Sequence, residues 1–337
     1  MYKATALFAL AVVSAFAQRP YGDSRVFAPV PDLPGYPEGI VVSKGKVYVS
    51  GPANFGVPGN NVPSRIHVFD LDTAAALPDI VIEGQVPFAP KALSSITADY
   101  KGNLYVLDVI RGVIKINPQT NQQSVYAGPF PVVYQSPYQQ GPSLPNDLAF
   151  DKKGNLYVTD SFQATIFRIP PGGGAPQPWI TDPRLDGIFG ANGIRFDKKG
   201  ENVYVTVTLD GNFGGYLYKL PVKETPLPSD LTLVQTFPGQ APDGIAFGKK
   251  GDLYIALALT NQIAVLKPNG SLQILNGPAQ SPNGAVPWLN PANIAFNDKA
   301  GTLLVTNHAS LVPNPVFNIF DVFVDDKAAH LFAAEGQ

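Results

Sequence analysis

Four residues with oxygen-bearing side chains stand at the same position of a repeated pattern: Glu38, Asn146, Asn192 and Asp243. Two carboxylates and two amide carbonyls that converge from distant parts of a chain suit a hard divalent cation. Calcium fits best, because it accepts about six to eight oxygen ligands in flexible geometry. The set has no His or Cys, which disfavours zinc and copper. Asn and Asp also favour turns, but turn chemistry alone does not place four donors at one phase of a repeat.

The pattern around these residues occurs six times. The copies read GIVVSKGKVYVSG from Gly39, SITADYKGNLYVLD from Ser95, DLAFDKKGNLYVTD from Asp147, GIRFDKKGENVYVTV from Gly193, GIAFGKKGDLYIALA from Gly244 and NIAFNDKAGTLLVTN from Asn293. Each copy predicts a short strand, a turn rich in Lys or Gly, and a second strand that alternates with period two. A third and a fourth apolar segment follow each copy, the last of them AHLFAA from Ala329.

The spacing of the copies predicts the fold. The residues that precede them, which we call the anchors, are separated by 56, 52, 46, 51 and 49 residues: Glu38, Ser94, Asn146, Asn192, Asp243 and Ala292. A period near 50 with four strands per unit is typical of a β-propeller blade. We therefore expect an all-β, six-bladed propeller of four-stranded blades, forming one domain over residues 18–337.

The propeller geometry decides which residues meet. The innermost strand of each blade starts beside the central channel, so the anchors should ring one mouth of that channel and the Lys/Gly turns the opposite end. For ring closure we expect an N-terminal strand, Arg25–Val30, to complete the sixth blade in competition with the segment at Ala329. The sequence thus predicts a cation site at one mouth, with Ser94 and Ala292 as gaps in the ring.

Four fragments resemble a known family: PEGI at Pro37, LPNDLAFDKKGNLYVTDS at Leu144, ANGIRFD at Ala191 and APDGIAFGKKGDLYIA at Ala241. They are similar to the gluconolactonase, senescence-marker-protein and luciferin-regenerating-enzyme family, with the paraoxonases as more distant relatives. This resemblance implies a six-bladed propeller hydrolase with a divalent cation in the channel. It implies Glu38, Asn146, Asn192 and Asp243 as metal ligands, and Asp243 also as catalytic base or nucleophile.

The sequence departs from that family where the substrate would bind. It has no clear counterpart of the arginine that holds a substrate carboxylate in sugar-acid lactonases, nor the histidine pair of the paraoxonases. The loops expected at the mouth carry aromatic residues and few charges. We expect an apolar or aromatic lactone or ester, held by Phe55, Tyr134, Phe189, Phe213, Trp288 and His308. Each aromatic residue could equally pack its loop onto the propeller rim.

Two functions remain open from the sequence. In the first, a cation polarises the carbonyl of a lactone or ester, and Asp243 takes a proton from water or attacks directly. In the second, the cation only rigidifies a non-catalytic propeller that binds a small ligand or a protein. A third possibility is a condensing enzyme on the same fold. It would need a channel carboxylate free of metal, whereas Glu38 and Asp243 are both expected to bind the cation.

Composition narrows the classes further. The net charge of −2 argues against nucleic acid as a partner, because neutralising phosphates needs a basic face. The absence of Cys excludes disulfides, thiol catalysis and cysteine-bound metals. With 32 glycines and 34 prolines, the chain turns often.

The first 17 residues, MYKATALFALAVVSAFA, predict a signal peptide with cleavage after Ala17. No other stretch approaches the roughly 18 apolar residues that a membrane span needs. We therefore expect a secreted or periplasmic protein.

Overall fold

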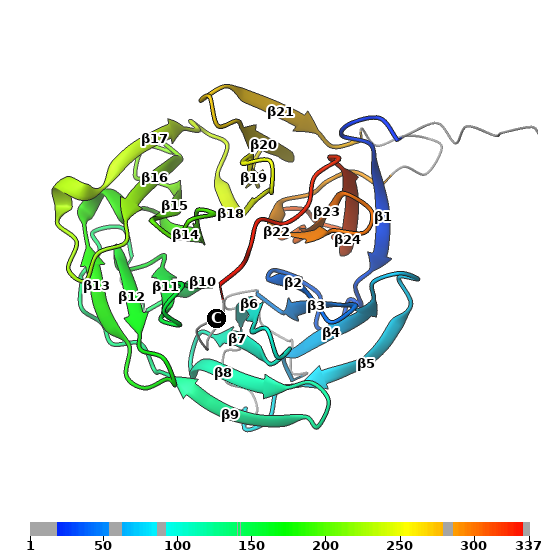
Figure 1. The fold of residues 1–337 in the computed structure, drawn as a ribbon, viewed down its shortest axis with the longest axis horizontal. Helices are drawn as coiled ribbons and strands as arrows, with labels where there is room; N and C mark the ends of the chain where they lie inside the picture. Colours follow the sequence, from blue (N-terminus) through cyan, green and yellow to red (C-terminus); the bar gives the residue numbers. More distant parts are fainter. Residues whose placement is uncertain are drawn as a thin grey trace, which may run out of the picture.

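The computed structural model describes residues 19–53, 63–85, 92–139, 141, 143–278 and 286–332. Within these ranges, 24 strands form six antiparallel sheets of four strands each. Figure 1 looks down the axis around which the sheets are arranged as blades. The all-β, six-bladed propeller predicted from the repeat is confirmed.

The blades run in chain order, each listed from its innermost strand outward. The first has β2 (Ile40–Ser43), β3 (Lys46–Gly51), β4 (Arg65–Asp70) and β5 (Ala76–Val81). The second has β6 (Leu93–Ala98), β7 (Leu104–Asp108), β8 (Gly112–Asn117) and β9 (Gln122–Ala127). The third has β10 (Pro145–Phe150), β11 (Leu156–Asp160), β12 (Thr165–Ile169) and β13 (Gln177–Thr181).

The second half of the ring repeats the scheme. The fourth blade has β14 (Phe189–Phe196), β15 (Asn202–Leu209), β16 (Tyr216–Pro221) and β17 (Thr232–Thr236). The fifth has β18 (Pro242–Phe247), β19 (Leu253–Leu257), β20 (Gln262–Leu266) and β21 (Leu272–Asn276). The sixth has β22 (Pro291–Asn297), β23 (Thr302–Asn307), β24 (Asn318–Phe323) and β1 (Ser24–Pro29). Two short 3-10 helices, Pro183–Leu185 and Pro228–Asp230, lie in connections.

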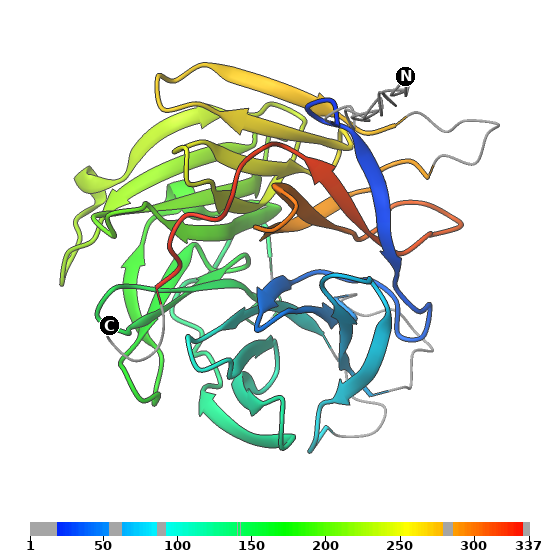
Figure 2. The same cartoon turned by 45° about the vertical axis from the view of Figure 1, so that its right-hand side comes forward.

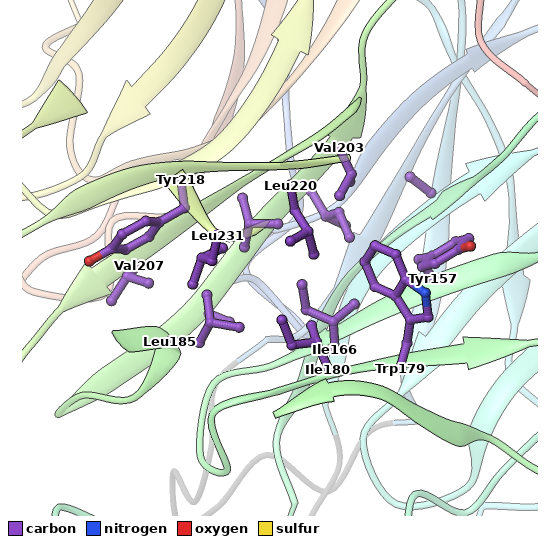
Figure 3. Close-up of a cluster of buried hydrophobic side chains, with 14 of the residues drawn as sticks. Tyr157, Ile166, Trp179, Ile180, Leu185, Val203, Val207, Tyr218, Leu220 and Leu231 are labelled. Atoms are coloured by element: carbon purple, nitrogen blue, oxygen red, sulfur yellow. The ribbon is translucent and has the colours of Figure 1, made fainter. Parts of the chain in front are cut away.

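The hydrophobic core lies between neighbouring blades. Figure 3 shows one such cluster, shared by the third and fourth blades, in which the rings of Tyr157 and Trp179 meet edge to face at 4.8 Å. Full burial of a large apolar side chain contributes about 1.5–3 kcal/mol. Because the second strands are packed on both faces, all five residues of β7 and of β11 are buried.

The turns between first and second strands use an aspartate and a glycine. Asp151 Oδ1 accepts from the backbone N–H groups of Lys153 and Asn155 at 2.8 and 2.9 Å, and its Oδ2 accepts from the Asn155 side chain at 2.8 Å. Gly154 has a φ of 82°, a region that favours glycine. These bonds fix the turn and therefore the start of β11.

The N-terminal strand closes the ring, as predicted. β1 pairs antiparallel with β24, from Ser24 opposite Val322 to Pro29 opposite Asn318. β1, drawn in blue, forms the outer edge of the sixth blade in Figure 1 and Figure 2. A sheet closed in this way ties the start of the domain to its end.

The segment at Ala329 is not a fourth strand, so that prediction is wrong. The outer edge of β24 is already occupied by β1, and the chain instead leaves the sixth blade and crosses the middle of the ring in Figure 1. There Ala328 and Phe332 line a cavity with the ends of innermost strands that lie away from the anchors, such as Phe150. Ala329 donates its N–H to Phe247 O at 2.8 Å, and the Phe332 ring lies 6.4 Å from that of Phe196. Among the described residues, no helix has the length and apolar character needed to cross a membrane.

Candidate functional site

A cavity of about 340 Å³ opens at the mouth where the innermost strands begin. Three of the four predicted ligands, Glu38, Asn146 and Asp243, line it. The fourth, Asn192, is only 2% exposed and hydrogen-bonds Asp243. The structure thus brings the four residues together at one mouth, while their role as ligands stays a prediction.

The four side chains fit a hard cation. Asp243 Oδ1 is buried and has no hydrogen-bond partner among the described residues, an arrangement that is costly unless something else satisfies the oxygen. The amide nitrogens of Asn146 and Asn192 donate to Ser161 and Thr208 at 3.0 and 2.9 Å, so the carbonyl oxygen of each amide lies at the end that faces away from the hydroxyl. Oxygens of carboxylates and amides are what calcium takes as ligands.

The amides are essential to any such site. In the part of the chain that the structure describes, no three His, Cys, Asp or Glu side chains group in a way that would hold a metal ion. A cation at this mouth would therefore depend on the oxygens of Asn146 and Asn192 as well as on the two carboxylates.

Burial and like charges raise the pKa values of both carboxylates. Desolvation, followed by repulsion from Asp147, raises the pKa of Asp243 to about 8, and a hydrogen bond from Asn192 offsets part of this rise. Desolvation, followed by repulsion from Asp243 and Asp147, also raises the pKa of Glu38 well above its usual value. A bound cation would favour the charged forms of both groups.

The backbone of three anchors is held by threonines of the preceding blade. Each threonine lies on a second strand and donates its hydroxyl proton to an anchor carbonyl. The pairs are Thr306 to Glu38 at 2.7 Å, Thr159 to Asn192 at 2.5 Å and Thr206 to Asp243 at 2.8 Å. These bonds cross the blade boundaries, so the position of each anchor depends on the assembled ring.

An ion pair lies directly behind the mouth, and the sequence analysis missed it. Asp147 follows Asn146 in β10 and accepts from Arg195 Nη1 at 2.6 Å and from Ser95 Oγ at 2.6 Å. Both charged side chains are largely buried, with 13% of Arg195 and 1% of Asp147 exposed. The sequence carried a signal for this pair, because the other copies of the repeat have uncharged residues at the positions of Asp147 and Arg195.

His308 lies in the cavity wall, as predicted. Its Nε2 donates to Ala53 O at 3.0 Å and lies 3.7 Å from Glu38 Oε2. Burial lowers the pKa of His308 to about 4, so the ring is neutral near pH 7. The structure therefore offers a neutral N–H group beside Glu38.

The predicted aromatic contacts are only partly assembled. Phe189 lines the cavity, whereas Phe55 lies outside the described residues. Tyr134 packs against the core between the third and fourth blades, and Phe213 is 60% exposed, away from the cavity lining. Trp288 must be removed from the predicted set. Its indole is 2% exposed, packs in the core of the last two blades and donates to Ser24 Oγ at 2.9 Å.

Large aliphatic residues that the sequence analysis did not select also line the cavity. Ile188, Leu209, Leu259 and Leu311 surround the opening, and no Lys or Arg stands among the described lining residues. These residues lie in connections at the mouth or at the end of a strand that leads to it. The phase of the repeat indicates which connections lie at the mouth, so the sequence did carry a signal for them. The site is thus polar at its base and apolar at its rim.

Fold and site together define a six-bladed propeller with an acidic, amide-bearing pocket at one mouth. The chain matches the family described as the SMP-30/Gluconolactonase/LRE-like region over residues 63–309, and it belongs to that family. A gluconolactonase of Zymomonas mobilis is 25% identical over 240 residues. That match covers 63% of this chain and 59% of the relative.

Solved structures share the fold. Regucalcin from Agrobacterium tumefaciens, described as a calcium-binding protein, superposes with a TM-score of 0.66 at 15% identity, covering 93% of this chain and 97% of the other. A gluconolactonase from Xanthomonas campestris gives a TM-score of 0.61 at 16% identity, covering 92% and 93%. At these identities the likeness concerns the architecture alone.

Proposed function

We propose that the protein is a divalent-cation-dependent hydrolase of an apolar lactone or ester. The observation that carries this proposal is the pocket base, where the unpartnered Asp243 Oδ1 stands beside Glu38 and the two amides. Family membership and the gluconolactonase relative support lactone chemistry. Calcium is the cation we propose, since every donor is an oxygen.

Glu38, Asn146, Asn192 and Asp243 would hold the cation. When bound, a divalent cation polarises a substrate carbonyl and stabilises the charge that develops on its oxygen. Asp243 is the group that we assign to proton transfer. It lines the cavity and lies at the pocket base, and the bound cation would keep its carboxylate in the charged form that accepts a proton.

The reaction adds water across the acyl C–O bond. Asp243 accepts a proton from the attacking water, whose oxygen bonds to the carbonyl carbon. The bond from that carbon to the ring or alkoxy oxygen breaks, and the leaving oxygen takes up a proton as a hydroxyl. His308 keeps its Nε2–H on Ala53 O and remains neutral throughout.

The pocket wall supports the choice of an apolar substrate. Ile188, Leu259 and Leu311 offer apolar surface to the part of a substrate that points outward, and the described lining has no cationic side chain to pair with a sugar acid. Burying this surface favours alkyl or aryl substituents by roughly 25 cal/mol per Å².

A substrate panel tests the proposal. Wild-type protein and Asp243→Asn are assayed with alkyl lactones, gluconolactone and aryl esters, with calcium and with EDTA. We expect calcium-dependent turnover of alkyl lactones and a loss in kcat of roughly 10²- to 10⁴-fold in Asp243→Asn. A stoichiometric bound ion without turnover of any substrate would instead support the non-catalytic binding module.

We also propose that the protein is exported. The predicted signal peptide, residues 1–17, lies outside the described residues, so the proposal rests on the sequence. Expression with its own leader and N-terminal sequencing of the exported product tests it. We expect the mature chain to begin at Gln18, and retention of an intact Met1 would contradict export by cleavage.

A further inference from the structure

Two hydroxyls stand behind the two amide anchors. Asn146 Nδ2 donates to Ser161 Oγ at 3.0 Å, and Asn192 Nδ2 donates to Thr208 Oγ1 at 2.9 Å. Ser161 is fully buried and Thr208 is 6% exposed. Both sit at the mouth end of a second strand, next to the anchor of their own blade.

Each hydroxyl is committed to act as an acceptor toward the amide. Ser161 Oγ donates its proton to Ala191 O at 2.7 Å, and Thr208 Oγ1 donates to Pro242 O at 3.0 Å. A hydroxyl has one proton and two lone pairs. Because the proton is used on a carbonyl of the next blade, only lone pairs face the amide. The amide must therefore turn its NH₂ group toward the hydroxyl and its oxygen away from it.

The carboxylate anchors lack this arrangement. One backbone hydrogen bond identifies the position equivalent to Ser161 in another blade. The N–H of Ser161 donates to Leu144 O, the carbonyl two residues before the anchor Asn146, at 2.9 Å. By the same bond, Ala53 occupies this position behind Glu38, and Ala258 occupies it behind Asp243. A carboxylate carries oxygen at both ends and needs no orientation, whereas an amide presents oxygen only when it is turned correctly.

We propose that Ser161 and Thr208 are positioning residues that hold the carbonyl oxygens of Asn146 and Asn192 toward a divalent cation. The inference rests on the proposed function, because it concerns the same cation site. Outer partners of this kind commonly change metal affinity by about 10- to 100-fold when they are removed. Each hydroxyl also joins consecutive blades. Its bond to the amide sets the orientation of the ligand, and its bond to a carbonyl of the next blade helps to set the position of the next anchor.

The test measures metal affinity rather than turnover. Calcium binding by calorimetry and terbium luminescence are compared for wild type, Thr208→Val, Thr208→Ser and Ser161→Ala. Thr165→Val is the matched control, since this buried hydroxyl bonds Gln163 O at 2.6 Å, away from the anchors. We expect Thr208→Val and Ser161→Ala to bind about 10- to 100-fold more weakly, with Thr208→Ser and Thr165→Val close to wild type.

A double-variant cycle separates orientation from packing. In Asn192→Asp the side chain carries oxygen at both ends, so adding Thr208→Val to it should no longer weaken binding. Thermal melting in EDTA reports the structural cost of each variant, and we expect Thr208→Val and Thr165→Val to lose similar stability.

The outcomes distinguish the two proposals. If wild type binds calcium and Thr208→Val binds equally tightly, the positioning role is overturned while the proposed cation site stands. If Thr208→Val weakens binding by the same factor in wild type and in the Asn192→Asp background, orientation is not the cause and the inference is also overturned. If wild type binds neither calcium nor terbium, the proposed function itself fails.

Discussion

Arg195 Nη1 donates to Asp147 Oδ2 at 2.6 Å. Asp147 directly follows the anchor Asn146 in the chain. Desolvation raises the pKa values of Glu38 and Asp243, and repulsion from the carboxylate of Asp147 adds to this rise. The pair therefore places one compensated negative charge behind the candidate cation site. A buried ion pair of this kind adds little net stability, but breaking it leaves an uncompensated buried charge.

The first prediction concerns this pair. Arg195→Met should lower the free energy of unfolding by about 3–5 kcal/mol, because Asp147 loses its partner. Arg195→Met combined with Asp147→Asn should recover part of that loss, since no buried charge is left. Urea denaturation of the single and double variants measures both. A single variant as stable as wild type would show that the pair does not carry this charge balance.

The second prediction is a pH dependence of the cation-free protein. The pKa of Asp243 is raised from 3.8 to about 8, so its protonated form is favoured in the folded state and stability falls as pH rises through this window. His308, whose pKa is lowered from 6.5 to about 4, acts oppositely below pH 6.5. Between pH 6.5 and 8, only the first of these two effects remains.

Denaturation in EDTA between pH 6.5 and 8 checks this expectation. Wild type should lose stability as pH rises, and Asp243→Asn, which cannot ionise, should show a smaller slope. A wild-type stability that rises with pH across this window would contradict the assignment of the raised pKa.

The third prediction is that calcium binding releases protons. Asp243, whose pKa is raised to about 8, is largely protonated in the cation-free protein near pH 7, burial also raises the pKa of Glu38, and a cation binds the charged forms of both. Calorimetry in two buffers of different ionisation enthalpy should give different apparent binding enthalpies. At about 100 times Kd, calcium should add about 2.7 kcal/mol of stability and raise Tm by several degrees. Equal enthalpies in both buffers would argue against protonated carboxylates at the site.

The fourth prediction concerns the apolar wall. Leu259→Ala should raise KM for an alkyl lactone by roughly 5- to 30-fold with little change in kcat, because about 1–2 kcal/mol of apolar contact is lost equally from bound substrate and transition state. Phe213→Ala is the control, since this exposed ring lies outside the cavity lining. Equal effects of the two variants on KM would remove Leu259 from the substrate site.

The fifth prediction tests the revised role of Trp288. Trp288→Ala should lower the free energy of unfolding by about 3–5 kcal/mol, because a buried indole and its bond to Ser24 are lost. KM of the folded fraction should stay at the wild-type value. A raised KM with unchanged stability would return Trp288 to the substrate site.

The repeat alone determined the architecture and the phase of the anchors. Strand alternation and a period near 50 residues are local and periodic, so they survive without any knowledge of packing. The same phase placed Glu38, Asn146, Asn192 and Asp243 at one mouth, because every blade enters the channel in the same register. The sequence also offered Arg25–Val30 as a closing strand, but it left the segment at Ala329 as a competitor, and the pairing of β1 with β24 decided between them.

Only the tertiary structure decided what surrounds the anchors. The sequence predicts both Trp288 and Phe189 as aromatic residues at the mouth. In the structure Trp288 fills the core and Phe189 lines the cavity, because the paths of the loops depend on contacts between blades. The same holds for the pair of Arg195 and Asp147 and for the hydroxyls of Ser161 and Thr208. Arg195 and Asp147 lie on neighbouring blades, and Ser161 and Thr208 donate their hydroxyl protons to carbonyls of the next blade. The side-by-side packing of blades in the ring brings these groups within hydrogen-bond distance.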